Sequence, residues 1–148
     1  MEISSTDKKI LNILLKDSRL SYRQIAKEIS VSTATVMTHV KSLEKKGIIK
    51  RYTTELSFLK LGYEFKAIIE MRISKGKLFE IERKIAKHPN VYAVYDVTGD
   101  YDAVVIARFK TRSSLDGFLK KIQSYDFVER THTSLILNVL KERQDNFD

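Results

Sequence analysis

The sequence predicts an α+β chain in which three N-terminal helices, including a helix-turn-helix, precede a four-stranded antiparallel sheet covered by two helices. Apolar residues recur at helical spacing up to Gly47. From Phe65 they alternate with a period of two, as in a half-buried strand. Beyond that point strand and helix patterns follow in the order βαββαβ. The 148 residues are sufficient for two small domains.

The first predicted helix starts near Thr6, which is the expected N-cap. Asp7 follows it and suits the positive end of a helix dipole. A break at Asp17-Ser18-Arg19 ends the helix. Its broad apolar face consists of Ile10, Leu11, Ile13, Leu14 and Leu15.

Residues 21–47 are typical of two short helices joined by a tight turn. Ser21 is followed three residues later by Gln24, which predicts a capping box at the start of the first helix. Ser30-Val31-Ser32 interrupts the apolar pattern, and Ser32 starts the next helix. Gly47 stands where a left-handed residue would end that helix. The buried stripe of the second helix consists of Val36, Val40 and Leu43.

The outward face of this second helix carries side chains that suit duplex DNA. In a helix-turn-helix the N-terminal residues of the second helix meet base edges, while flanking residues meet phosphate. The residues expected at base edges are Thr33, Ala34, Met37, Thr38 and Lys41, and Ser32 is also expected to bind DNA. The residues expected at phosphates are Tyr22, Arg23, Thr35, His39, Lys45, Lys50 and Arg51. None is an evident bidentate reader of guanine or adenine, so DNA shape is expected to contribute to specificity.

Positive charge is concentrated in the part of the chain that contains this motif. Residues 1–63 hold 12 Lys and Arg against 6 Asp and Glu, whereas residues 64–148 hold 15 against 13. The first part thus has a net charge of +6 and the second of +2. An ordinary surface helix kept soluble by its lysines is the alternative, but this distribution favours a phosphate-binding surface.

Composition indicates a globular, cytoplasmic protein. No run approaches the roughly twenty apolar residues that cross a bilayer, and the N-terminus lacks the pattern of a signal peptide. Cysteine is absent, which excludes disulfides, thiolate zinc sites and cysteine nucleophiles.

The second half predicts a ferredoxin-like βαββαβ domain. Lys50–Ser57 is expected to be extended, as strand and linker. Strands are then expected at 65–74, 91–98, 103–109 and 128–140, with helices from Leu78 to about His88 and from an N-cap at Ser113 or Ser114. The predicted domains are residues 1–52 (helix-turn-helix), 53–63 (strand and linker) and 64–148 (βαββαβ).

Several of the predicted strands carry apolar side chains on both faces, although two helices can cover only one face. Val94, for example, alternates with Ala93, Tyr95 and Val97. An uncovered apolar sheet face usually marks a partner surface. We therefore expect dimerisation through the sheet, which would place two reading helices about one DNA turn apart.

The order of several short motifs resembles the Lrp/AsnC (feast/famine) family of transcriptional regulators, over essentially the whole chain. The matching segments are residues 7–11, 17–19, 32–36, 40–49 and Thr98-Gly99-Asp100-Tyr101-Asp102. The resemblance implies a regulator whose dimers pair through their C-terminal sheets and often assemble further, commonly into octamers. Many members respond to an amino acid bound where dimers meet. His39 and Ser42 stand where the family often has arginine, which implies fewer phosphate contacts and a more pH-dependent DNA affinity.

The Gly99–Asp102 segment has two interpretations. Glycine and aspartate favour a tight turn with no further role. The resemblance favours an effector site instead, in which the backbone of Gly99, Asp100, Tyr101 and Asp102 holds an amino acid and the carboxylates attract its ammonium group. Looser candidates are Thr98, Thr131, Thr133 and Ser134. Apart from an amino-acid effector, no cofactor or metal is expected.

The sequence argues against two other function classes and leaves a third open. An enzyme is not expected, because the three histidines lie in separate elements and no glycine-rich phosphate loop is present. An RNA-binding sheet is disfavoured, because Tyr92 and Tyr95 alternate to opposite faces and its signature motif is missing. An effector-independent architectural DNA-binding protein, or a sensor module without strong operator specificity, stays open as the alternative.

Overall fold

The computed structural model describes residues 3–74, 76, 78–143 and 146, which form two compact units. The first comprises the described residues up to Glu55 together with those from Lys141 onward, and the second comprises Leu56–Leu140. The C-terminal residues thus group with the first unit, although the sequence assigns them to the second. A contact of 2.7 Å between Arg143 Nη1 and Glu55 Oε2 helps to hold them there. No helix in the described ranges has the length and apolar character to cross a membrane.

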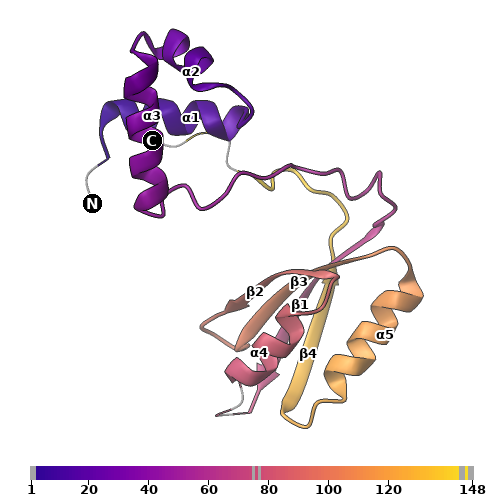
Figure 1. Cartoon of the computed structure of the whole chain (residues 1–148). Helices are drawn as coiled ribbons and strands as arrows, with labels where there is room; N and C mark the ends of the chain where they lie inside the picture. Colours follow the sequence, from indigo (N-terminus) through magenta and orange to yellow (C-terminus); the bar gives the residue numbers. More distant parts are fainter. Residues whose placement is uncertain (1–2, 75, 77, 144–145, 147–148) are drawn as a thin grey trace. The chain divides into compact units, whose positions relative to one another are not determined.

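The first unit is a bundle of three helices: α1 (Ser5–Lys16), α2 (Tyr22–Ile29) and α3 (Thr33–Lys45) (Figure 1). The predicted apolar stripes form its core. The residues buried there include Ile10, Ile13, Ile25, Ala26, Val36 and Val40.

Helix ends are fixed by reciprocal hydrogen bonds. Ser4, rather than the predicted Thr6, caps α1: its Oγ accepts from the Asp7 N–H at 3.1 Å, and its own N–H donates to Asp7 Oδ2 at 3.0 Å. Thr6 lies inside the first turn because the serine three residues before Asp7 closes a capping box. The predicted capping box of Ser21 and Gln24 is confirmed.

The end of α3 is also as predicted. Gly47 has φ +69°, and its N–H donates to the Glu44 carbonyl at 2.9 Å. The Ile48 N–H donates to the Leu43 carbonyl, also at 2.9 Å. This pair of bonds is a Schellman motif, which satisfies carbonyls that would otherwise be unpaired at the helix end.

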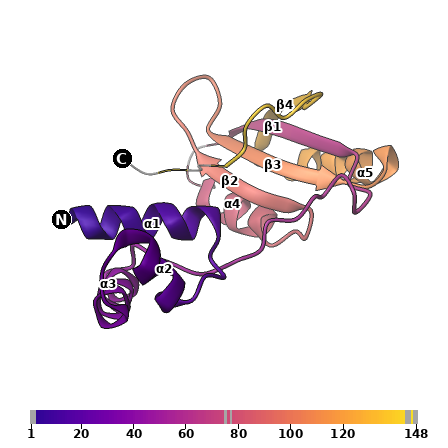
Figure 2. The same ribbon diagram turned by 90° about the horizontal axis from the view of Figure 1, so that it is seen from above.

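The second unit is the predicted βαββαβ fold with sheet order β2-β3-β1-β4 and antiparallel pairing throughout. Figures 1 and 2 show α4 and α5 on one side of the sheet. The elements are β1 (Phe65–Ile73), α4 (Leu78–Ala86), β2 (Val91–Asp96), β3 (Ala103–Phe109), α5 (Arg112–Gln123) and β4 (Val128–Leu135).

Strand ends differ from the prediction. Residues 51–57 are not a strand, and β2 ends at Asp96 rather than residue 98. β4 ends at Leu135 rather than residue 140. It pairs with β1, and the last bond, from the Ile136 N–H to the Lys66 carbonyl at 2.8 Å, lies at the end of that strand. Beyond this point apolar character alone cannot maintain a strand, and Leu140 is 99% exposed.

The two faces of the sheet differ as predicted. Ala67, Ile69, Met71 and Ile73 of β1 are buried in the core that α4 and α5 cover. Val94 also packs on that core, opposite in direction to Ala93 and Tyr95. The face without helices carries partly exposed apolar side chains, namely Ile68, Ala93, Tyr95, Val104 and Ile106.

The N-cap of α5 is Thr111 rather than Ser113 or Ser114. Its Oγ1 accepts from the Ser114 N–H at 3.1 Å. Replacing Thr111 by alanine should therefore lower the free energy of unfolding by about 1 kcal/mol, the usual value of such a cap. The matched variant Ser113→Ala should change it by less than about 0.5 kcal/mol. Urea unfolding followed by circular dichroism measures both, and an equal loss in the two variants would show that Thr111 is not the cap.

Candidate DNA interface and effector loop

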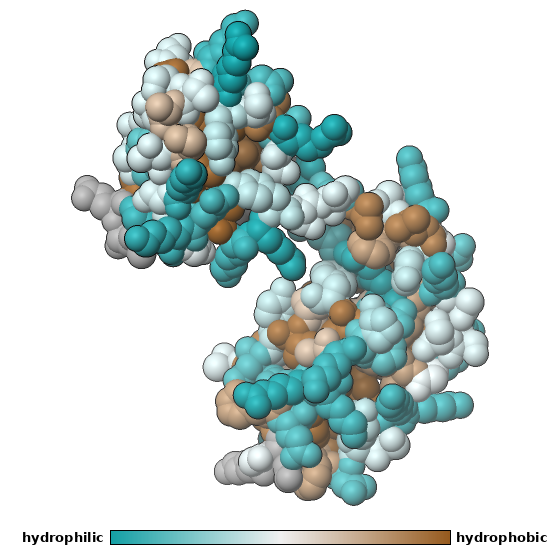
Figure 3. All heavy atoms as spheres, in the orientation of Figure 1, coloured by the Kyte–Doolittle hydropathy of each residue, from teal (hydrophilic) through white to brown (hydrophobic). Residues whose placement is uncertain are grey.

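The residues predicted at base edges share the outward face of α3. Thr33, Ala34, Thr38 and Lys41 are exposed, and Met37 is 38% exposed. The opposite side of α3 is fixed in the core by Val36, Val40 and Leu43, each at most 1% exposed. The structure therefore presents the predicted set together on one surface. Figure 3 shows hydrophilic side chains projecting from the visible face of the first unit.

Hydroxyl groups on this face are partly used inside the helix. Thr38 Oγ1 donates to the Ala34 carbonyl at 2.9 Å. Ser32 Oγ accepts from the Thr35 N–H at 3.0 Å and lies 2.8 Å from Thr35 Oγ1. With its proton donated within the helix, Thr38 offers a methyl group and oxygen lone pairs to a partner. Ser32 acts as the cap of α3.

His39 has a contact that the sequence did not predict. Its Nδ1 lies 2.7 Å from Asp7 Oδ1 of α1, and the side chains are 29% and 12% exposed respectively. The imidazole thus braces α3 against α1, with one nitrogen committed to this contact. The predicted phosphate contact is left with the other nitrogen alone.

The Asp7 carboxyl is the polar group at the centre of the first unit. Burial by itself raises its pKa, but hydrogen bonds from His39 and Ser4 outweigh burial, and the pKa of Asp7 lies below its usual value. Asp7 is therefore ionised at neutral pH, and its carboxylate contacts the N-cap Ser4 of α1 and His39 in the middle of α3. The sequence motif indicated only the helix-dipole role of this residue.

The predicted phosphate-contacting residues vary in exposure. Arg23, Lys45, Lys50 and Arg51 are exposed, whereas Thr35 is half-buried. Tyr22 is also half-buried, and packs against the core of the first unit.

Tyr52 holds the chain that follows α3 against that helix. Its hydroxyl donates to Glu44 Oε1 at 2.8 Å. Burial, followed by the bond to Glu44, raises the pKa of Tyr52 to about 12. This contact was missed because Tyr52 lies outside any periodic pattern.

The connection between β2 and β3 is fixed to β1 by Asp102. The Asp102 N–H donates to the Met71 carbonyl at 2.9 Å, and Asp102 Oδ2 accepts from the Ile73 N–H at 2.8 Å. Gly99 within the connection has φ +122°, a backbone conformation that favours glycine. Asp102 therefore has a clear structural role, whatever else the loop binds.

The rest of the loop lies beside cationic groups of β1 and β4. Arg72 Nη1 donates to the Asp100 carbonyl at 3.3 Å. The Tyr101 ring lies 5.8 Å from the guanidinium carbon of Arg130 and 6.5 Å from the His132 ring. Arg72 and Arg130 are partners in the strand register. This juxtaposition of arginines with an exposed Asp100 was not predicted, because it depends on the pairing of distant strands.

The looser effector candidates do not come together. Thr131 accepts from Gln123 Nε2 of α5 at 3.1 Å, and Thr133 pairs with the buried Ile69, so both lie on the helix side of the sheet. Ser134 points to the opposite face, where its Oγ is 3.4 Å from His132 Nε2. The grouping fails because side chains alternate along a strand. Thr98 is exposed in the loop itself.

Comparison with known protein families also gives two domains, although the second match extends past Leu140, where the second unit ends. Residues 3–50 match a winged helix-turn-helix DNA-binding domain. Residues 66–145 match the Lrp/AsnC ligand binding domain. An uncharacterized HTH-type transcriptional regulator of Pyrococcus furiosus is 47% identical over 142 residues, covering 96% of each chain. Relatives of this kind are named as regulators rather than as enzymes.

Solved structures agree with this assignment. Escherichia coli AsnC superimposes with a TM-score of 0.90 at 25% identity, covering 97% of this chain and 98% of that one. A Neisseria meningitidis transcriptional regulator, solved in complex with L-Met, gives 0.89 at 24% identity, covering 97% and 96%. The second likeness is one of fold.

Substitution of Asp7 tests how much its contacts with His39 and Ser4 stabilise the first unit. Asp7→Asn should lower the free energy of unfolding by about 1–2 kcal/mol at pH 7, because the charge-assisted bonds to Ser4 and His39 are lost. Since the folded-state pKa of Asp7 is lowered, this advantage of the wild type is present above about pH 4 and is lost as pH falls through the folded pKa. Urea unfolding at pH 7 and at pH 3 measures it.

The matched control is Glu28→Gln on the exposed surface of α2. It removes the same charge and should change stability by less than about 0.5 kcal/mol at either pH. If Asp7→Asn lowers the free energy of unfolding no more than Glu28→Gln does, the contact between Asp7 and His39 does not stabilise the first unit.

Proposed function

The chain belongs to the Lrp/AsnC family of DNA-binding transcriptional regulators, and from this premise we propose that α3 reads the major groove of an operator while the Thr98–Asp102 loop binds an amino acid. The observation that carries the proposal is the exposed face of α3, on which small, hydroxyl and cationic side chains adjoin and are held rigidly from behind. Such a face suits base edges and phosphates at once.

In this proposal α3 reads bases mainly through shape and apolar contact. Ala34 and Thr33 are small enough for a close approach, and the Thr38 oxygen can accept a bond from the amino group of adenine or cytosine. Methyl groups of Ala34 and Thr38 suit the thymine methyl. Specificity arises partly from how easily the operator deforms, because bidentate base readers are missing among the predicted contacts.

The same proposal takes the uncovered face of the sheet as the dimer surface. Ile68, Val104 and Ile106 are partly exposed there, beside Tyr95 at 54% exposure. Pairing of two such faces removes apolar area from water. The resulting twofold symmetry presents two α3 helices to a palindromic operator, and we expect the dimers to assemble further in the cytoplasm, into the octamers that the family resemblance implies.

The effector is proposed to bind by both of its charged ends. Arg130 suits an α-carboxylate, as does Arg72, whose Nε already lies 3.8 Å from Glu129 Oε2, and the Asp100 carboxylate suits an ammonium group. Asp102 is less suited, because one of its oxygens is already bonded to β1. The L-Met complex of the Neisseria regulator supports an amino acid as the ligand class. The runner-up is an architectural DNA-binding protein that needs no effector.

Lys41 and Lys45 test the DNA interface. The double variant Lys41→Ala/Lys45→Ala should weaken binding to the chain's own upstream DNA, through the lost base-edge contact of Lys41 and the lost phosphate contact of Lys45. It should reduce the slope of log affinity against log salt by about 1, since each phosphate contact contributes roughly 0.9. Fluorescence anisotropy between 50 and 200 mM salt measures this. Lys120→Ala on α5 removes one equivalent charge and should leave the slope unchanged. An unaltered slope in the double variant would refute the assignment of α3.

Asp100 tests the effector loop. Asp100→Asn should weaken amino-acid binding by about tenfold or more, measured calorimetrically across the amino acids, while DNA binding without ligand is unaffected. Asp126→Asn, an exposed site between α5 and β4, is the charge-matched control. If no amino acid binds the wild type and operator affinity is indifferent to all of them, the architectural alternative is favoured.

A further inference from the structure

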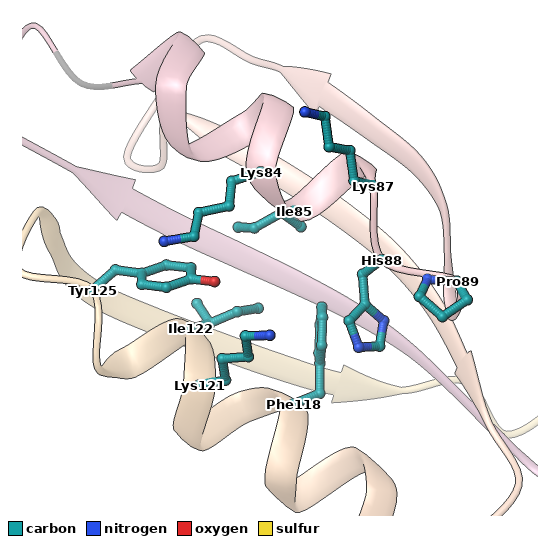
Figure 4. A pocket seen from close by; sticks show the side chains of 9 residues that line it. All are labelled: Lys84, Ile85, Lys87, His88, Pro89, Phe118, Lys121, Ile122 and Tyr125. Carbon is teal, nitrogen blue, oxygen red and sulfur yellow. The ribbon is translucent and has the colours of Figure 1, made fainter.

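A pocket of about 230 Å³ lies between α4 and α5, in the helix layer of the second unit (Figure 4). It is distinct from the loop at Gly99–Asp102, because none of that loop's residues lines it. The proposed DNA interface and effector site do not account for it.

The floor of the pocket is apolar and preformed. Ile85 of α4 and Ile122 of α5 are 3% and 1% exposed, and Phe118 of α5 is 5% exposed. The Phe118 ring is fixed by Phe109, with ring centroids 5.2 Å apart. These side chains belong to the core of the unit, so a ligand would meet a surface that is already ordered.

The rim of the pocket is cationic. Lys84, Lys87 and Lys121 contribute to it, and no carboxylate is among its lining residues. Figure 4 shows Lys84 and Lys121 extending into the space between the helices. The Lys84 ammonium lies 4.3 Å from the centroid of the Tyr125 ring, which holds it at the mouth of the pocket.

His88 adds a neutral donor to this rim. Its Nδ1 accepts from the Asn90 N–H at 3.3 Å, so in the neutral imidazole the proton is on Nε2. Its ring lies 4.7 Å from that of Phe118. Burial, together with the charge of Lys121, lowers the pKa of His88. Lys84, Lys87 and Lys121, with no carboxylate among the lining residues, make the local potential positive, as a site for an anion requires.

We propose that this pocket binds a small organic carboxylate with a compact apolar body. The carboxylate would lie between Lys84 and Lys121, and the apolar body against Ile85, Phe118 and Ile122. The volume is below the roughly 300–1,000 Å³ typical of drug-sized ligands, which favours a single ring or a short branched chain. Inorganic phosphate would leave the floor uncovered, and an acidic peptide would engage the rim without entering.

A bound carboxylate would connect the two helices that form the layer. It would contact α4 through Lys84 and Ile85, and α5 through Lys121 and Phe118. Because such a ligand binds the folded state only, it stabilises that state by RT ln(1 + [L]/Kd), so the unfolding temperature rises with ligand concentration.

Calorimetry and thermal unfolding of the full chain test the proposal with phenylacetate and 4-methylpentanoate, which lack the α-amino group of an effector. We expect one site per chain and a ligand-dependent rise in unfolding temperature. Phenylacetamide, of the same shape without charge, should bind at least about tenfold more weakly, since a charge-assisted bond is lost. Inorganic phosphate should bind more weakly than phenylacetate.

Matched variants locate the site. Lys121→Gln should weaken phenylacetate binding about tenfold, whereas Lys120→Gln, one residue away and outside the lining, should change it less than about twofold. Lys84→Gln provides a second test from the other helix, and Asp100→Asn should have no effect. The proposal is overturned if neither carboxylate binds, if phosphate binds as tightly as phenylacetate, or if Lys120→Gln matches Lys121→Gln.

Discussion

The position of β1 in the middle of the sheet is the constraint on which the second unit depends. It pairs with β3 on one side and β4 on the other, and alternates between a buried face and a face without helices. A slip of one residue would exchange Ile69 and Met71 with Ile68 and Glu70 between these faces. The same strand receives the β2–β3 loop, because Asp102 bonds to the backbone of Met71 and Ile73. Core, loop and candidate effector groups are therefore fixed by one register.

The first unit depends on a polar contact in an equivalent way. The apolar stripe of α3 sets which side of this helix faces inward, but it would still allow α3 to shift along its own axis. The bond between His39 and Asp7 fixes the position of α3 along that axis, because it joins α3 to the capped N-terminal end of α1. The cost is one imidazole nitrogen that is no longer available to DNA. Rigid presentation of the neighbouring residues Thr38 and Lys41 is what this arrangement provides.

Sequence reasoning succeeded where the relevant rule is local. Alternation located β1, the serine and glutamine spacing located the cap of α2, and Gly47 located the end of α3. It failed where a choice among neighbouring residues or distant partners decides the outcome. The predicted N-cap of α1 was Thr6 and the observed one is Ser4; for α5, Ser113 or Ser114 was predicted and Thr111 is observed. In both cases several neighbouring hydroxyl groups could have served as the cap.

The candidate site shows the same limit. Exposure of the α3 residues follows from helical periodicity, and the structure presents them as predicted. The roles of His39, Arg72 and Arg130 depend instead on contacts between segments 28 or more residues apart. Thr131 and Thr133 were grouped with Ser134 by sequence proximity, although alternation in β4 separates them.

Two ligand sites on one sheet would act on different parts of the molecule. The loop lies at the end of β1 next to cationic groups of the uncovered face, so an amino acid there bears on how copies of the chain meet. The pocket lies in the helix layer and is bounded by core side chains, so a carboxylate there bears on the stability of the unit itself. Buried residues of β1 lie between the two, and β4 offers a second connection, because Thr131, next to Arg130, is hydrogen-bonded to Gln123 of α5. The packed strand register resists small displacements along either connection. The two inputs are accordingly separable by point substitution, and coupling between them would pass through β1 or β4.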